Sequence, residues 1–162
     1  MHERNSHCSY CGTRFTETCR WPRVCRACGN TSYLNPLPVA VVVAPVGNGI
    51  VVVRRNTEPQ KGTLTLPGGY IDYGETWQEA GARELREETG IVIDAGEISL
   101  YDVMNGLDNT LVIFGLAAEQ PASAYRPFSS QETQEVSLIL QPIELGFVMH
   151  SEVVSRYFAW KK

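Results

Sequence analysis

The sequence has no long hydrophobic run. Its longest apolar stretch, Val39–Val46, is interrupted by Pro45 and is far shorter than the roughly 20 residues that a membrane-spanning helix needs. The segment Met1-His2-Glu3-Arg4-Asn5 is not followed by an apolar stretch, so we expect no secretory signal, no membrane span and a cytoplasmic location. The 162 residues are 43% hydrophobic and 20% charged, which excludes a disordered chain and suits one domain with a small appendage.

Cysteine is absent after residue 28, and lysine is absent from residues 1–35. Residues 1–35 carry five Arg and two Glu, whereas the remainder carries an excess of acidic residues that brings the net charge of the chain to −4. Charge and cysteine together therefore divide the chain near residue 35, before the stiff run Asn35-Pro36-Leu37-Pro38. We predict two domains, residues 1–35 and residues 36–162.

Two Cys-x-x-Cys pairs dominate the first domain. The paired residues are Cys8 with Cys11 and Cys25 with Cys28. Four thiolates from two tight turns complete the tetrahedral shell that Zn²⁺ prefers, so we predict a closed, structural Zn²⁺ site in a small zinc ribbon. Two disulfides or redox motifs are the alternative, but a reducing compartment and the doubled motif favour the metal.

Two further residues of this region are not needed for the metal shell. Cys19 has no cysteine partner at ligand spacing, so we expect a free or packed thiol. His7 is a potential substitute ligand, but four thiolates already complete the shell. The five Arg are too few and too scattered to predict nucleic-acid binding, and the basic character is a weak signal.

The second domain alternates predicted strands with two helices. Val39–Ala44 and Ile50–Arg55 are typical of strands and are expected to pair as a hairpin. Further strands are predicted at Leu64–Leu66, Ile98–Val103, Thr110–Leu116 and Val136–Leu140, and an apolar stripe over Ser151–Trp160 predicts a helix that packs on the sheet. This mixture indicates an α/β or α+β domain with layered helices.

An acidic helix follows Pro67-Gly68-Gly69. Thr76 and Glu79 form a capping box, and Gly90 is a C-terminal stop, so we predict a helix from about residue 77 to 89. Its Glu84, Glu87 and Glu88 stand at i, i+3 and i+4 and share one face. Such a face is often merely solvated, but hard cations such as Mg²⁺ and Mn²⁺ take carboxylate oxygens together with substrate phosphates. Arg83 is expected to pair with Glu87 and leave the other two carboxylates free.

The stretch from Gly69 to Ile91 resembles a complete Nudix box, Gly-x₅-Glu-x₇-Arg-Glu-U-x-Glu-Glu-x-Gly-U with U aliphatic. The resemblance implies the Nudix α/β/α sandwich around a mixed sheet over residues 36–162. With the N-terminal four-Cys ribbon, the chain is similar to the NADH pyrophosphatase group and related zinc-ribbon Nudix hydrolases. The Ser-Gln-Pro-Trp-Pro-Phe-Pro-x-Ser run expected of NADH pyrophosphatases does not occur anywhere in the sequence.

The resemblance carries roles onto individual residues. It implies that Glu84, Glu87 and Glu88 bind Mg²⁺ or Mn²⁺, that Arg83 orients them, and that Glu75 braces the loop on the helix. The carbonyl of Gly69 is implied as a further metal ligand.

Four charged residues outside the box complete the expected site. The family often takes a further base or ligand from a later loop, where Glu132 and Glu135 are the candidates here. Arg54 and Arg55 are candidates for contact with a substrate phosphate. Solvated loop charges and surface salt bridges are the alternatives for these four residues.

These residues predict a metal-dependent hydrolase that cleaves the pyrophosphate bond of a nucleoside diphosphate linked to another moiety, such as NADH, FAD or ADP-ribose. The alternative is a catalytically weak Nudix-like nucleotide sensor whose ribbon binds nucleic acid or protein. A ribbon that mediates a homodimer is a further alternative. The sequence does not distinguish the substrates within this class.

Overall fold

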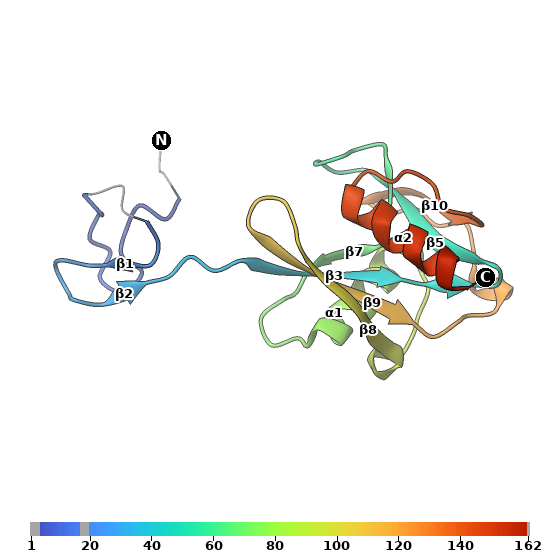
Figure 1. Ribbon diagram of the computed structural model, residues 1–162, viewed down its shortest axis with the longest axis horizontal. Coiled ribbons are helices and arrows are strands. Elements are labelled where there is room, and N and C mark those ends of the chain that lie inside the picture. The colour runs from blue at the N-terminus through green and yellow to red at the C-terminus, as the bar shows by residue number, and fades with distance from the viewer. Residues whose placement is uncertain (1–3, 17–19, 162) are drawn as a thin grey trace. The chain divides into compact units, whose positions relative to one another are not determined.

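The computed structural model describes residues 4–16 and 20–161 and divides into two compact units, Met1–Pro36 and Leu37–Lys162 (Figure 1). The first unit has one two-stranded antiparallel sheet, β1 (Arg23–Val24) and β2 (Thr31–Ser32), and an isolated bridge between His7 and Arg14. The expectation for Cys19 falls outside the described residues.

The second unit contains two four-stranded sheets. In the first, β5 (Gly49–Arg55) is central and pairs antiparallel with β10 (Thr133–Ile139), β4 (Pro45–Val46) and β6 (Leu64–Thr65). The second is mixed and has the order β7–β3–β9–β8. Its strands are β7 (Gly68–Tyr70), β3 (Leu37–Val43), β9 (Thr110–Ala117) and β8 (Ile98–Asn105), with β3 and β9 parallel.

The hairpin expected between Val39–Ala44 and Ile50–Arg55 is wrong. β3 pairs with β7 and β9 and not with β5. Of the residues that precede β5 in this part of the chain, the two of β4 form its ladder. The physical reason is that β3 is buried on both faces, since Val41 and Val43 pack in one core cluster and Val42 packs in another. A strand that is apolar on both faces belongs in the middle of a covered sheet, and not in an edge hairpin.

Two helices pack on the strands, and each belongs to a different core cluster. α1 (Trp77–Thr89) contributes Leu85 to a cluster with Val42, Val51 and Val53. α2 (Val148–Trp160) packs in the other cluster, which holds the alternate residues of β3 and β5, on their opposite face, together with residues of β9. Figure 1 shows α1 and α2 on opposite sides of β3. This confirms the layered arrangement of helices around a mixed sheet.

The ends of the other elements differ little from the prediction. α2 begins three residues before the expected Ser151, because the carbonyl of Phe147 accepts hydrogen bonds from the N–H groups of His150 and Ser151. The short 3₁₀ helices η1 (Ala95–Glu97) and η2 (Ala122–Ala124) were not predicted. In the part of the chain that the structure describes, no helix combines the length and apolar character required to cross a bilayer.

Candidate active site

The capping box fixes where α1 starts. The Thr76 hydroxyl accepts from the Glu79 N–H at 3.2 Å, and the Glu79 carboxylate accepts from the Thr76 N–H at 2.7 Å. The helix ends at Gly90, whose left-handed φ of 74° is a conformation that glycine adopts without strain. Both ends agree with the predicted helix, so the register of its acidic face is set by local sequence.

The three carboxylates of that face differ in exposure. Glu84 and Glu88 are buried, with 9% and 5% of their surface exposed, whereas half of the Glu87 side chain is exposed. Burial raises the pKa of Glu84, although Arg83 opposes the effect. Two acidic groups that are removed from water on one helical face are costly unless a cation approaches them.

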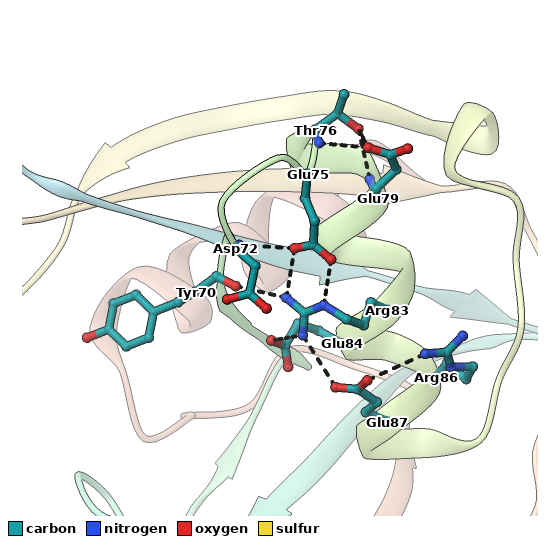
Figure 2. Close-up of polar contacts among 9 residues, drawn as sticks. All are labelled: Tyr70, Asp72, Glu75, Thr76, Glu79, Arg83, Glu84, Arg86 and Glu87. Carbon is teal, nitrogen blue, oxygen red and sulfur yellow. Dashed lines mark hydrogen bonds and ion pairs between the residues drawn. The ribbon is translucent and has the colours of Figure 1, made fainter.

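Arg83 is the cation that approaches Glu84 and Glu87 in the structure (Figure 2). Its guanidinium lies 2.7 Å from a Glu75 oxygen, 2.6 Å from a Glu84 oxygen and 3.3 Å from a Glu87 oxygen, and it also donates to the Tyr70 carbonyl at 2.9 Å. The expected pair of Arg83 with Glu87 is therefore present, but the expectation that Glu84 is left free is wrong. The reason is the neighbouring loop, which presents Glu75 and brings the guanidinium across the helix face.

Glu75 connects the loop to the helix. It accepts two hydrogen bonds from Arg83 and one from the Asp72 N–H at 3.0 Å, and these bonds lower the pKa of its carboxyl. A carboxylate with three charge-assisted donors holds its geometry well. Glu75 is thus ionised at neutral pH and fixes Arg83 beside Glu84.

Glu88 is held from the other side, by the backbone of β7. Its carboxylate accepts the Gly68 N–H at 2.9 Å, and burial raises its pKa to about 7. The next residue, Gly69, lies against Glu84, since a Cβ placed on it would lie 2.6 Å from the Glu84 carboxylate carbon. The Gly-Gly pair therefore lets the backbone approach both buried carboxylates.

The two arginines after the buried part of β5 have different surroundings. Arg54 forms an exposed ion pair with Glu135 at 2.7 Å and donates to the Gly62 carbonyl. Arg55 donates to the Pro59 carbonyl at 2.8 Å, and its charge lowers the pKa of Glu88. Arg55 is therefore within electrostatic reach of the acidic face.

The two glutamates of the later loop also separate. The charge of Glu132 raises the pKa of both Glu84 and Glu88, which places it near them. Glu135 is the third residue of β10 and lies opposite Arg54, whereas Glu132 directly precedes the strand. Of the two candidates, Glu132 is the one whose charge acts on the buried carboxylates.

His150 is a buried residue near this region that the sequence did not single out. Its Nδ1 accepts the Leu66 N–H at 3.2 Å, and its ring packs against Phe114 and Phe147. Burial lowers its pKa to about 3. No spacing motif includes His150, because its partner is 84 residues earlier in the chain.

The donor atoms of the four paired cysteines converge. The Sγ atoms of Cys8, Cys11, Cys25 and Cys28 all lie within 4.8 Å of one another, and the Cys8–Cys28 and Cys11–Cys25 pairs are 3.7 Å apart. A tetrahedron with Zn–S bonds of about 2.3 Å has edges of about 3.8 Å, so these residues fit the metal. Backbone N–H groups of Cys11 and Tyr10 lower the pKa of the Cys8 thiol to about 6, which favours the thiolate that Zn²⁺ requires. At Cys28 the Asn30 backbone N–H acts in the same direction, but burial and the other three thiols outweigh it and raise the pKa to about 11.

Within residues 4–16 and 20–161, this is the one group of three or more such side chains whose donor atoms meet so closely. The carboxylates of α1 do not converge in the same way, because Arg83 holds Glu84 and Glu87 while Gly68 holds Glu88. Their oxygens are nevertheless the hard donors that Mg²⁺ and Mn²⁺ prefer, together with backbone carbonyls. The donor set of α1 and β7 thus fits a hard divalent cation.

Comparison with known proteins agrees with this fold. The NUDIX domain model matches residues 35–155. The chain therefore belongs to the NUDIX domain family. A crystal structure of a NUDIX hydrolase from Nitrosomonas europaea superposes with a TM-score of 0.75 over 95% of this chain and 90% of that chain at 23% identity, which shows the shared fold.

Two curated relatives match over shorter regions. ADP-ribose pyrophosphatase from Methanocaldococcus jannaschii is 40% identical over 60 residues, which is 37% of this chain and 36% of the relative. NAD-capped RNA hydrolase NudC from Escherichia coli is 28% identical over 94 residues, which is 57% of this chain and 36% of the relative. The chain thus spans about a third of the length of these curated relatives.

Proposed function

We propose that this protein is a metal-dependent Nudix pyrophosphohydrolase that cleaves the pyrophosphate bond of a nucleoside diphosphate linked to another moiety. The observation that carries the proposal is the pair of buried carboxylates, Glu84 and Glu88, on one face of α1, with the glycine backbone of β7 against them. Of these two buried carboxylates, Arg83 pairs with Glu84 only, and Glu88 accepts a backbone N–H, so the pair favours a bound cation. We assign Mg²⁺ or Mn²⁺ to this site, with Glu84, Glu87, Glu88 and the Gly69 carbonyl as ligands.

When bound, a divalent cation lowers the pKa of water and neutralises charge on phosphoryl oxygens. The side chains of this chain supply the remaining functions. Arg83, braced by Glu75, positions Glu84 and Glu87. Arg55, whose charge already acts on Glu88, is placed to attract a substrate phosphate, whereas Arg54 is engaged by Glu135.

A general base is required to take the proton of the attacking water, and we assign this role to Glu132. Its charge acts on both buried carboxylates, and it is exposed directly before β10. General-base catalysis contributes typically about 10²–10⁴-fold to a rate. Glu135 is the weaker candidate because its carboxylate pairs with Arg54.

The substrate class rests on the curated relatives and on the two-domain organisation. One relative is named as an ADP-ribose pyrophosphatase and another as an NAD-capped RNA hydrolase. Both ADP-ribose and NAD contain an adenosine diphosphate unit joined to a second group. We propose dinucleotides and ADP-sugars, with ADP-ribose, NADH and FAD as the first compounds to test.

The compact unit Met1–Pro36, with its four converging thiols, supports a structural zinc ribbon that precedes the hydrolase domain in the sequence.

The test is a panel of ADP-ribose, NADH, FAD and nucleoside triphosphates, incubated with the full chain and Mg²⁺ or Mn²⁺ and scored by chromatography for mononucleotide products. We expect AMP from at least one dinucleotide or ADP-sugar, and no AMP when a chelator is added. Hydrolysis of triphosphates alone would overturn the substrate class. Binding of ADP-ribose without any hydrolysis would favour the alternative, a nucleotide sensor. Sedimentation of the same sample tests the further alternative, a homodimer.

A further inference from the structure

The passage from Leu66 to Gly69 determines where the backbone meets the two buried carboxylates. Gly68 donates to Glu88 at 2.9 Å, and Gly69 lies against the carboxylate of Glu84. The Pro67 carbonyl accepts from the Val42 N–H at 2.9 Å, which ties the passage to β3. A small shift of this passage would therefore move both carboxylate contacts at once.

At Leu66 the passage is tied to α2. β6 pairs with β5 through Leu64 and Thr65 only, so the next N–H, that of Leu66, lies beyond the ladder. Leu66 is 2% exposed, and its N–H donates to Nδ1 of His150 at 3.2 Å. A buried backbone N–H needs such a partner, and here the partner comes from the first turn of α2.

The imidazole itself is held in a single orientation. The His150 ring is 6% exposed, and it makes an edge-to-face contact with Phe114 at 5.6 Å between centroids and a tilted contact with Phe147 at 5.1 Å. Because Nδ1 accepts, the proton of the neutral ring is on Nε2. Burial and the charge of Arg55 lower the pKa of His150 to about 3, so the accepting form persists throughout the neutral range.

We propose that His150 is a positioning residue of the metal site: by accepting the Leu66 N–H, it fixes the place at which the Gly68 N–H and the Gly69 backbone meet Glu88 and Glu84. The proposal rests on the proposed function, since it assigns a cation to those carboxylates. His150 touches neither the carboxylates nor the substrate in this role. It acts through the backbone of the turn before β7.

Two substitutions separate the acceptor from the packing. His150→Asn places a side-chain oxygen near the position of Nδ1, whereas His150→Leu keeps apolar bulk and removes the acceptor. Val154→Ala is the matched control, because Val154 is a fully buried residue of the same helix. Its truncation destabilises the protein but leaves the hydrogen bond between His150 and the Leu66 N–H in place. All three are made in the full chain, and their thermal stabilities are measured first.

Two readouts do not depend on turnover. The first is NMR amide hydrogen exchange at Leu66 and Gly68 without metal, and the second is a Mn²⁺ titration followed by electron paramagnetic resonance. We expect faster exchange at both amides and about tenfold weaker Mn²⁺ binding in His150→Leu, as for other residues that orient metal ligands. We expect His150→Asn to recover most of both effects and Val154→Ala to leave Mn²⁺ binding at the wild-type value.

Equal Mn²⁺ affinities in His150→Leu and wild type would overturn the proposal, and so would an Asn variant that behaves like the Leu variant. A Val154→Ala protein with the same loss of Mn²⁺ affinity would reduce His150 to a packing residue. If the wild type binds Mn²⁺ in the manner described but hydrolyses no compound of the panel, the proposed function fails and the positioning role stands. If the wild type binds no Mn²⁺, both fail.

Discussion

Glu88 has the most perturbed carboxyl group of the candidate site. It is almost fully buried, it accepts one backbone N–H, and its pKa is raised to about 7. We predict that Glu88→Gln lowers turnover by about 100-fold or more, because a neutral amide cannot bind a divalent cation or accept a proton as a carboxylate does. Folding should be retained, since the amide keeps an oxygen to accept the Gly68 N–H.

The measurement is steady-state hydrolysis with the best substrate of the panel, together with the melting temperature of each protein. Glu97→Gln makes the same change of charge at an exposed glutamate of η1 and is the matched control. Full activity of Glu88→Gln would contradict the assignment.

The raised pKa of Glu88 also predicts how stability depends on pH. Between the ordinary value of 4.5 and about 7, the unfolded chain has released this proton while the folded chain retains it. The contribution of Glu88 to folding is therefore present below pH 4.5 and is lost as the pH rises through about 7, and it amounts to at most about 3 kcal/mol.

A bound cation should reverse this trend, because it favours the ionised carboxylate. We expect the increase in melting temperature on addition of Mg²⁺ or Mn²⁺ to be small at pH 5.5 and larger at pH 8. Differential scanning fluorimetry across this range checks it, with Glu88→Gln as the reference in which the pH-dependent part is reduced. A stabilisation that shrinks as the pH rises would contradict the prediction.

At this scale the sequence predicted which residues share a face and that Arg83 and Glu87 pair, but not which of the carboxylates are buried. The spacing placed Glu84, Glu87 and Glu88 together, whereas the burial of two of them depends on β7, which comes from a different part of the chain. The bond between Arg83 and Glu84 depends in the same way on the loop that carries Glu75. Contacts set by tertiary structure have no signal in local spacing.

At the scale of elements, α1 is specified by its own sequence. The predicted capping box at Thr76 and Glu79 is present, and the helix spans the predicted residues. We predict that Thr76→Ala lowers the free energy of unfolding by about 1 kcal/mol, because the cap hydroxyl and one side of the box are lost. For a protein of this size, that corresponds to a decrease in melting temperature of about 2–4 °C.

Thermal denaturation of Thr76→Ala and Thr76→Ser checks this prediction. Serine preserves the hydroxyl and the capping geometry, so Thr76→Ser should remain near the wild-type stability. A serine variant as unstable as the alanine variant would show that the methyl group, and not the cap, stabilises the helix start.

The strands were predicted better than their pairing. The strands predicted at Ile98–Val103 and Thr110–Leu116 are β8 and β9, and they form an antiparallel pair because a short connection favours local pairing. β3 was assigned to the wrong partner, since a strand buried on both faces gives no alternation from which to infer its neighbour. Partner choice between strands is a property of the whole sheet.

At the scale of the molecule, the two units differ in how they are stabilised. Leu37–Lys162 has two apolar clusters, whereas the core of the first unit consists chiefly of Cys8, Cys25 and the contact of Phe15 with Trp21. A ribbon this small cannot bury enough apolar area to fold unaided, so we expect bound metal to supply its folding free energy. We predict one zinc per chain.

Mass spectrometry of the metal content checks the stoichiometry, and limited proteolysis with and without a strong zinc chelator checks the consequence. The chelator should make residues 1–36 susceptible to cleavage while Leu37–Lys162 keeps its far-ultraviolet circular dichroism. Purified protein without zinc but with a protease-resistant first unit would contradict the prediction.

The connection from β3 to β4, which leads from one sheet to the other, restricts where a residue can be inserted. Val43 is the last residue of β3 and Pro45 the first of β4, so a single residue, Ala44, separates pairing in one sheet from pairing in the other. One inserted residue here would exchange the faces of β4 relative to β3, and the buried Val46 would point away from its core cluster. Ala44 is thus the fixed spacer between pairing in one sheet and pairing in the other. Insertions should be tolerated in the exposed Leu107-Asp108 turn between β8 and β9 and rejected at this position.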